Sequence, residues 1–384
     1  MNERGVALPT ALLALSILLT LMTAFAVLSA TEPVIAGNHL KSARARALAE
    51  AGIERAIWAL SNPTAAPGGL GDPLPSQMPS EYSGTFVSLS ALGGFTLNVT
   101  NGAASNERAV VSVGWTPTND ASDTTPKGVK KIQTTVMRLR SLDPPCALCI
   151  DGSLEVGGHA VVDARSGWCA GGSAPIGGTM TTGTTTETGT SHQIFGPGND
   201  VPNQSPEDIA TGVSSSYFGF KLADGEITVL NNLAKANGTY FQGAQSFSTN
   251  PPFKSGIVFV DTTTGNLLMS STPSSEVASV TIDGTFSWSG WLIVAGSLNV
   301  RGSPALTGLL YAQNDVNIRG SASIRGAIVG ENRQSSSERR NSAESSETGN
   351  VTITYDCAAA RDGGGTIPTS WFVKPGTFVQ LDGQ

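Results

Sequence analysis

Charged and aromatic side chains are scarce in this sequence, at 14% and 6% of its 384 residues. The net charge is −7, and no basic run occurs outside the Lys127–Arg140 region, which argues against a nucleic-acid partner. Glycine, by contrast, occurs 45 times, and serine and threonine are abundant. This composition is typical of a turn-rich β protein outside the cytoplasm rather than of a helical enzyme.

Patterns of catalytic and metal-binding residues are also missing. Histidine occurs only three times, and neither His159 nor His192 is accompanied by a G-x-S-x-G nucleophile elbow. No D-x-D-x-D-G spacing indicates a calcium loop. We therefore expect no enzyme, no cofactor and no metal site, although His159 leaves open an acyltransferase site of the hexapeptide-repeat kind.

Cysteine is limited to four copies, an even number that predicts two disulfides with three pairings open. Cys146-x-x-Cys149 also matches half of a zinc site, which Cys169, Cys357 or His159 would have to complete, and no second C-x-x-C exists. A thioredoxin-like redox motif would need a βαβ context, whereas the flanking residues are typical of strands. We expect disulfides.

The longest stretch without charge is Val6–Thr31. As a helix it is about 39 Å long, enough to cross a hydrocarbon core of about 30 Å. It is too long for the apolar part of a secretory signal, although Ser29-Ala30 resembles a weak cleavage site. Strong helix formers continue to Leu60, before Asn62-Pro63. We predict one helix over 6–62, a membrane anchor followed by a stem.

A short charged leader with Glu3 and Arg4 ends in Gly5, directly before this helix, and the stem contains Ala49-Glu50-Ala51-Gly52. These features resemble the class III signal of type IV pilins and pseudopilins, most of all the PilX-type minor pilins. The resemblance implies a leader over 1–5, cut after Gly5 by a prepilin peptidase, and methylation of the new amine of Val6.

One position departs from that family. Its usual glutamate at the fifth mature position is Thr10 here, which resembles the subunits that prime or cap a filament. The resemblance further implies contacts with other pilins through the apolar helix. It implies that the precursor crosses the inner membrane once, with the head in the periplasm. After assembly the protein is expected in a surface filament, where the head contacts a surface or glycan ligand.

The stem is amphipathic, and Pro33 and Gly37 are expected to bend the helix where it leaves the membrane. One face serves for packing on the protein's own sheet and another for the stems of other subunits. Two overlapping apolar stripes are predicted: Leu40, Ala43, Ala47 and Ala51, and then Ile53, Ile57 and Leu60.

An antiparallel, pilin-like sheet is predicted for residues 80–142. Alternating apolar residues indicate strands at Gly94–Thr100, Ala109–Trp115 and Lys130–Arg140, separated by turn clusters.

From Val280 the chain repeats the hexad apolar-x-apolar-x-Gly-x. Three hexads make an 18-residue turn, and Ser297–Ala312 matches Asp315–Gly330 at that spacing. The pattern predicts a triangular β-solenoid of parallel strands within a domain over 146–384. The expected corner residues are Gly284, Gly290, Gly296, Gly302, Gly308, Asn314, Gly320 and Gly326.

Residues 148–164 contain one earlier turn, expected to stack on the later ones across an insertion of about 166–278. Within the insertion we predict an extended loop at Gly171–Ser191 and a buried strand at Gly256–Asp261. Helices are predicted at 205–217 and at Thr228–Ala236.

The polar stretch 331–350 is predicted to be a mobile loop. After it, Val351–Asp356 returns as a strand and places Cys357 where it can tie the repeat to its earlier turn. The tail Trp371–Leu381 is expected to cover the open edge of the solenoid.

Together these features predict an α+β protein with a long transmembrane and stem helix, a pilin-like antiparallel sheet and a hexad-repeat β-solenoid. The favoured function is a non-enzymatic minor pilin or pseudopilin that primes assembly or acts at the tip. Two alternatives stay open: a membrane-anchored β-helix enzyme or carbohydrate-binding protein, and an adhesin with an uncleaved anchor.

Overall fold

The computed structural model describes residues 7–63, 70–71, 73–139, 142–167, 177–198, 200–203, 206, 208–248, 254–334, 345–367 and 371–382. The chain forms two compact units, which we describe separately. Unit 1 comprises Met1–Arg138 and Ser370–Gln384, and unit 2 comprises Leu139–Thr369.

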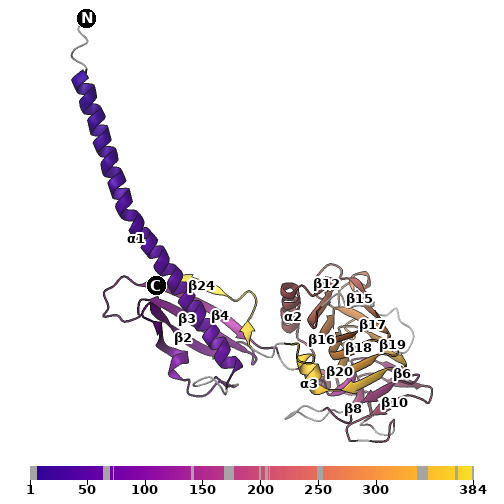
Figure 1. Cartoon of the computed structure of the whole chain (residues 1–384). Coiled ribbons are helices and arrows are strands. Elements are labelled where there is room, and N and C mark those ends of the chain that lie inside the picture. Colours follow the sequence, from indigo (N-terminus) through magenta and orange to yellow (C-terminus); the bar gives the residue numbers. More distant parts are fainter. Residues whose placement is uncertain are drawn as a thin grey trace. The chain divides into compact units, whose positions relative to one another are not determined.

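The predicted N-terminal helix is confirmed as α1 (Ala7–Ser61), an element of 55 residues (Figure 1). It continues through Pro33 and Gly37, the two residues expected to bend it. The helix ends where Asn62 donates from both its backbone N–H and its side-chain Nδ2 to the carbonyl of Trp58. Pro63 follows and has no N–H to extend the ladder.

An antiparallel sheet completes unit 1, and it includes the strands predicted in the 80–142 region. The sequence analysis missed the first strand, because its side chains are mostly exposed and show no apolar alternation. A single turn of 3-10 helix, η2 (Ser80–Tyr82), precedes it. The strands are β1 (Ser83–Ser90), β2 (Gly93–Asn101), β3 (Glu107–Thr116), β4 (Gly128–Met137), β23 (Phe372–Val373) and β24 (Val379–Asp382).

The stem half of α1 packs on this sheet through small residues. Ala45 and Ala49 are fully buried, and a Cβ added at Gly114 of β3 would lie 1.9 Å from the Ala45 carbonyl oxygen. The absence of a side chain at Gly114 therefore lets the helix approach the strand backbone closely. The buried stripe is Ala45, Ala49, Gly52, Ile53, Ala56, Ala59 and Leu60.

Of the two predicted stripes, the second is the one that packs on the sheet, because Ile53 and Leu60 are buried, whereas most of the first stripe is exposed. Leu40 is 50% exposed, and Ala43 and Ala47 are exposed as well. Small residues occur on both faces of this alanine-rich stem, so the apolar pattern does not show which face meets the sheet.

The C-terminal tail does not cover the open edge of the repeat, so this prediction was wrong. Instead of covering the repeat, β23 and β24 pair antiparallel with β4 in unit 1. Trp371 is buried there, with the guanidinium carbons of Arg108 and Arg138 at 5.0 and 5.7 Å from its ring centroid. Lys374 forms a 2.6 Å ion pair with Glu107 of β3. These contacts fix the tail on unit 1.

Unit 2 contains two largely parallel sheets around one apolar core. One sheet has the path β10-β7-β22-β20-β18-β16-β14-β12, with β5, β8 and β11 attached, and the other runs β13-β15-β17-β19-β21-β6-β9. Their bounds are β5 (Cys146–Ile150), β6 (Leu154–Gly157), β7 (Val161–Asp163), β8 (Gly177–Thr181), β9 (Thr185–Thr188), β10 (Gln193–Phe195), β11 (Ile209–Ala210), β12 (Tyr240–Gln242), β13 (Ala244–Ser248), β14 (Gly256–Asp261), β15 (Ala278–Gly284), β16 (Ser287–Val294), β17 (Gly296–Gly302), β18 (Ala305–Ala312), β19 (Val316–Gly320), β20 (Ser323–Gly330), β21 (Ser345–Gly349) and β22 (Thr352–Tyr355).

The spacing of the paired residues follows the sequence repeat. Ala278 pairs with Gly296, and Ser287 with Ala305, so that the paired strands from β15 to β20 are 18 residues apart. The inward positions carry aliphatic side chains such as Ile282, which pairs with Val300 and is 1% exposed.

The early segment lies beside the last strands of the repeat, as the sequence predicts. β5 pairs with β20, β6 with β21 and β7 with β22. The order of strands in space therefore differs from their order along the chain.

Much of the predicted insertion belongs to the sheets. β14 confirms the strand predicted at Gly256–Asp261, and α2 (Asp224–Asn237) confirms the helix predicted at Thr228–Ala236. Gly238, with φ 70°, ends α2. Other helices in unit 2 are short: η3 (Ser215–Phe218), η4 (Ser274–Glu276) and α3 (Cys357–Asp362).

Three local predictions were wrong in this region. The tract Gly171–Ser191 contains β8 and β9, whose threonines pair with β5 and β6. The segment expected to form a helix at 205–217 contains β11 instead. Within the stretch 331–350, residues 335–344 lie outside the described residues. The described parts contain β21 and Glu331, which is buried with its carboxylate bound by Tyr311 and Arg333. Backbone hydrogen bonds to neighbouring strands hold polar residues that composition alone would assign to loops.

Glycine in the parallel sheets allows neighbouring strands to meet without side chains between them. A Cβ at Gly308 (φ 127°) would lie 2.0 Å from the Gly290 carbonyl oxygen. We predict that Gly308→Ala lowers the free energy of unfolding by about 2–5 kcal/mol, from backbone strain and overpacking. Urea unfolding followed by circular dichroism measures this change.

Gly225→Ala is the matched control, because nothing lies within 4 Å of a Cβ at Gly225 in α2. This variant should be neutral or up to about 1 kcal/mol more stable. Equal unfolding midpoints for the two variants would contradict the packing argument.

Candidate functional site

The first half of α1 is apolar on every side and is not covered by the rest of the chain. An 18-residue window within Leu8–Ser61 has mean hydropathy 2.5, and none of it is buried. By length and composition this helix is able to cross a membrane. Its exposed large apolar residues are Leu8, Leu12, Leu13, Leu15, Ile17, Leu18, Leu19, Leu21, Met22, Phe25, Val27, Leu28, Val34 and Ile35.

Several hydroxyl groups in this half donate hydrogen bonds within the helix itself. Ser16 donates to the Leu13 carbonyl at 2.8 Å, Thr20 to Ile17 at 2.8 Å, and Thr31 to Leu28 at 2.8 Å. Such internal bonds satisfy polar side chains where no water is available, as in a bilayer. The helix surface therefore requires either lipid or other apolar helices around it.

Thr10 lies in the first turns of this helix, with its side chain exposed. It carries no charge at neutral pH, so the helix start presents no carboxylate at this position. The expected processing residues Gly5 and Val6 lie outside the described residues.

The exposed face of the stem continues the apolar surface beyond the anchor. Leu40, Ala43 and Ala47 remain uncovered in unit 1, and Trp58 is 38% exposed. Ion pairs border this surface: Arg46 meets Glu50 at 2.8 Å, and Arg55 meets Glu81 at 2.7 Å. Small residues on a helix face allow a second helix to approach closely.

The predicted corner glycines fall into two groups. φ lies between 76° and 154° at Gly284, Gly290, Gly302, Gly308, Gly320 and Gly326. Gly296 and Asn314 are not in this positive-φ region. At Gly296, a Cβ would lie 1.9 Å from the Ala278 carbonyl oxygen, so close strand approach explains glycine there. Asn314 contacts Ser297 through its side chain at 3.2 Å.

The cysteines of unit 2 are oxidised where the structure describes them. Cys146 and Cys149 are joined to each other and are fully buried within β5. Cys357 is also disulfide-bonded, and its N–H donates to the Gly167 carbonyl at 2.8 Å. Cys169 lies outside the described residues.

The two histidines of unit 2 differ in their surroundings. His159 is exposed, and its backbone N–H donates to the Gly349 carbonyl at 2.7 Å. His192 is buried, and its Nε2 contacts the carboxylate of Glu187. Among the described residues, no group of three or more His, Cys, Asp or Glu side chains is arranged to hold a metal ion.

Glu347 is an acid in the apolar interior. It occupies an inward position of β21, paired with Ile318 of β19 and Val156 of β6. The residue is 1% exposed, and neither carboxyl oxygen has a hydrogen-bond partner among the residues that the structure describes. Burial raises the pKa of this carboxyl to about 8. The sequence analysis missed Glu347 because it lies in the polar stretch expected to be a loop.

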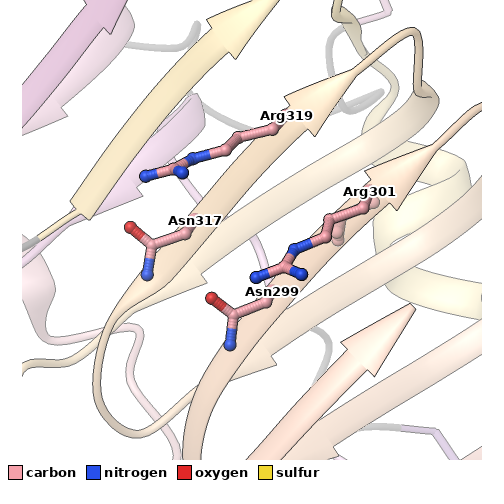
Figure 2. Close-up of a pocket in the computed structure, with 5 residues that line it drawn as sticks. Asn299, Arg301, Asn317 and Arg319 are labelled. Carbon is pink, nitrogen blue, oxygen red and sulfur yellow. The ribbon is translucent and has the colours of Figure 1, made fainter. Parts of the chain in front are cut away.

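A polar groove of about 180 Å³ lies on the outer face of β17 and β19. Figure 2 shows Asn299 beside Asn317 and Arg301 beside Arg319, on neighbouring strands. Each of these residues alternates with a buried aliphatic residue, Val300 or Ile318. The repeated tetrapeptides Asn299–Gly302 and Asn317–Gly320 carry this pattern in the sequence.

Comparisons with known proteins do not assign this chain to a family. No family model matches the chain, and no curated protein matches it. One solved structure similar to this chain is the competence-associated pilin ComZ from Thermus thermophilus, at 11% identity. The match covers 89% of this chain and 97% of that chain, with a TM-score of 0.23. This score is too low to support a shared fold or function.

The buried acid generates a prediction about pH. The folded protein keeps the Glu347 proton up to about pH 8, whereas the unfolded chain releases it near 4.5. The unfolded state therefore binds fewer protons between these values, and stability falls as pH rises through this window. The whole effect is on the order of 5 kcal/mol. Unfolding free energies measured at pH 5 and pH 9 test it.

Glu347→Ile should remove this part of the pH dependence and make the protein more stable at pH 9, because it continues the aliphatic row of Ile318 and Val156. Glu347→Gln separates charge from shape, since the amide is neutral at both pH values. If all three proteins lose the same stability between pH 5 and pH 9, the assignment of the effect to Glu347 is wrong.

Proposed function

We propose that this protein is a non-enzymatic, membrane-anchored subunit of a type IV filament system, of the minor pilin or pseudopilin class. The observation that carries the proposal is the two-part helix α1. Its first half is apolar all round and exposed, and its second half is packed on an antiparallel sheet of the same chain.

Assembly in this proposal is an exchange of one apolar environment for another. The anchor first lies in the inner membrane and then leaves the lipid by packing against the anchors of neighbouring subunits. Since lipid chains and aliphatic side chains are similarly apolar, helix packing decides the equilibrium. The exposed stem residues Leu40, Ala43 and Ala47 extend the same contact surface beyond the bilayer.

The processing steps belong to the same proposal. A prepilin peptidase cuts after Gly5 and the new amine of Val6 is methylated, with Arg4 holding the leader on the cytoplasmic side. The head then lies in the periplasm and, after assembly, at the cell surface. The charged residues Glu3 and Arg4 directly before the uncharged run support this proposal.

We also infer that the parallel sheets of unit 2 form a β-solenoid with 18-residue turns. The pairing of residues 18 positions apart supports it, as does the common core of the two sheets. A domain of this size between β4 and β23 is too large for regular repetition along a thin fibre. The proposed place of this subunit is therefore at or near the tip.

Thr10 gives the tip proposal a direct test. If a carboxylate at this position is needed to join the fibre along its length, Thr10→Glu should increase the number of copies in sheared filaments severalfold. Quantitative mass spectrometry of the sheared fraction measures this. Thr10→Ser is the control, because it keeps a neutral hydroxyl. Unchanged incorporation of Thr10→Glu would remove the argument that the missing carboxylate restricts this subunit to the tip.

A further inference from the structure

The groove on β17 and β19 combines cations with amides in a fixed geometry. Arg301 and Arg319 project from the outer face, and Asn299 and Asn317 lie beside them (Figure 2). Neighbouring strands of a sheet are about 4.8 Å apart, so equivalent side chains repeat at this distance. The two strands therefore present two guanidinium groups and two amide groups as parallel rows.

The two guanidinium groups are available for a ligand. Both arginines are exposed, and within the described part of the chain neither has an ion pair or a side-chain hydrogen bond. This differs from other arginines of unit 2: Arg325 pairs with Asp356 at 2.6 Å, and Arg361 pairs with Asp143. Two like charges on adjacent strands repel each other, and an anion between them would remove that repulsion.

Asparagine contributes a second kind of recognition. Asn317 accepts a 3.0 Å hydrogen bond from the Ser346 hydroxyl through Oδ1, which fixes the orientation of its amide. Its Nδ2 then remains a donor on the open side of the groove. Asn amides both donate to and accept from hydroxyl groups, whereas arginine forks bind planar carboxylates through two hydrogen bonds.

We propose that this groove binds an acidic polysaccharide, with Arg301 and Arg319 holding its anionic groups and Asn299 and Asn317 its ring hydroxyls. A linear polymer lying across the strands meets one Asn and one Arg per strand. The strand spacing is close to the length of one sugar residue, so successive residues meet equivalent side chains. The inference names the ligand of the head in the proposed filament subunit, but the binding itself needs only unit 2.

The lining of the groove disfavours single-stranded nucleic acid. The lining residues are Asn299, Val300, Arg301, Asn317 and Arg319, so no aromatic ring is present for bases to stack on. The position beside Arg301 on β15 is occupied by Asp283, so the basic row is limited to β17 and β19. A polyanion that binds through charge alone gains little from such a short basic row.

The experiment uses the full-length protein in neutral detergent and follows binding by isothermal titration calorimetry. Polygalacturonate is the carboxylated probe, and its methyl ester has the same backbone without the charge. Heparin supplies sulfate groups, and single-stranded DNA supplies phosphate without sugar carboxylates. We expect binding to polygalacturonate or heparin, and whichever binds more tightly identifies the anionic group. The methyl ester should bind at least about tenfold more weakly than polygalacturonate.

Three variants locate the binding in the groove. Arg301→Gln with Arg319→Gln should weaken it at least about tenfold, and Arg301→Lys with Arg319→Lys should recover only part, because lysine lacks the fork. Arg325→Gln is the control: it follows isoleucine and precedes glycine, as Arg319 does, but it lies on β20. It should bind as the unchanged protein does. Circular dichroism confirms that each variant is folded.

Several results would overturn the proposal. They are no binding to either acidic polysaccharide, equal binding by the glutamine double variant, and DNA binding as tight as polysaccharide binding. A failure of this kind leaves the filament proposal intact, because that proposal depends on α1. Conversely, if this protein is found to be absent from filaments, the proposal of a ligand site on unit 2 is not contradicted.

Discussion

An uncovered apolar surface on the first half of α1 is the constraint on which the rest of this protein depends. Residues from Leu8 to Ile35 expose large apolar side chains, and none of the described residues of unit 1 covers them. Water is an unfavourable environment for such a surface, at about 25 cal/mol for each Å². The helix therefore needs lipid or other helices, and a subunit that moves between the two meets this need at both stages.

The second half of α1 is covered within the chain, because its small residues are buried against the antiparallel sheet of unit 1. Gly114 brings the strand backbone up to Ala45, so this packing is close and specific. The tail returns to the same sheet: Phe372 pairs with Met137, the last residue of β4. In the sequence, the segment Leu139–Thr369 that forms unit 2 thus lies between two strands of unit 1 that pair with each other.

Within unit 2, a simple sequence rule produces a large structure. Aliphatic residues at alternate positions fill the core, and glycines let neighbouring strands approach, as at Gly308 against Gly290. Outer positions are then free to vary, and the Asn-x-Arg pairs of β17 and β19 occupy such positions. Glu347 is an exception, because it places a carboxyl group at an inward position. Burial raises the pKa of this carboxyl, so the stability of the folded state falls as pH rises.

Regular patterns in the sequence predicted the structure well, and irregular ones did not. The uncharged run and the helix formers after it predicted α1, and the hexads predicted the 18-residue pairing, because both patterns repeat over many residues. The threonine-rich strands β8 and β9 were missed, since backbone pairing with β5 and β6 holds them rather than side-chain burial in an alternating pattern. The sequence did not show which face of the stem packs on the sheet, because alanines occur on both faces.

The candidate site was predicted in a similar, partial way. The apolar anchor was evident from its length and its lack of charge. The groove was visible only as a repeated tetrapeptide, because a sequence does not show that two arginines lie on adjacent strands and form no ion pair with the described residues. The tail was misplaced because its pairing with β4 links residues that are far apart in the sequence.

The most direct measurement is mass spectrometry of the mature N-terminus. The account requires a chain that begins at a methylated Val6 and retains the whole apolar helix. An intact Met1, or a chain that begins near Thr31, would contradict it, because the leader would then be uncut or the anchor lost.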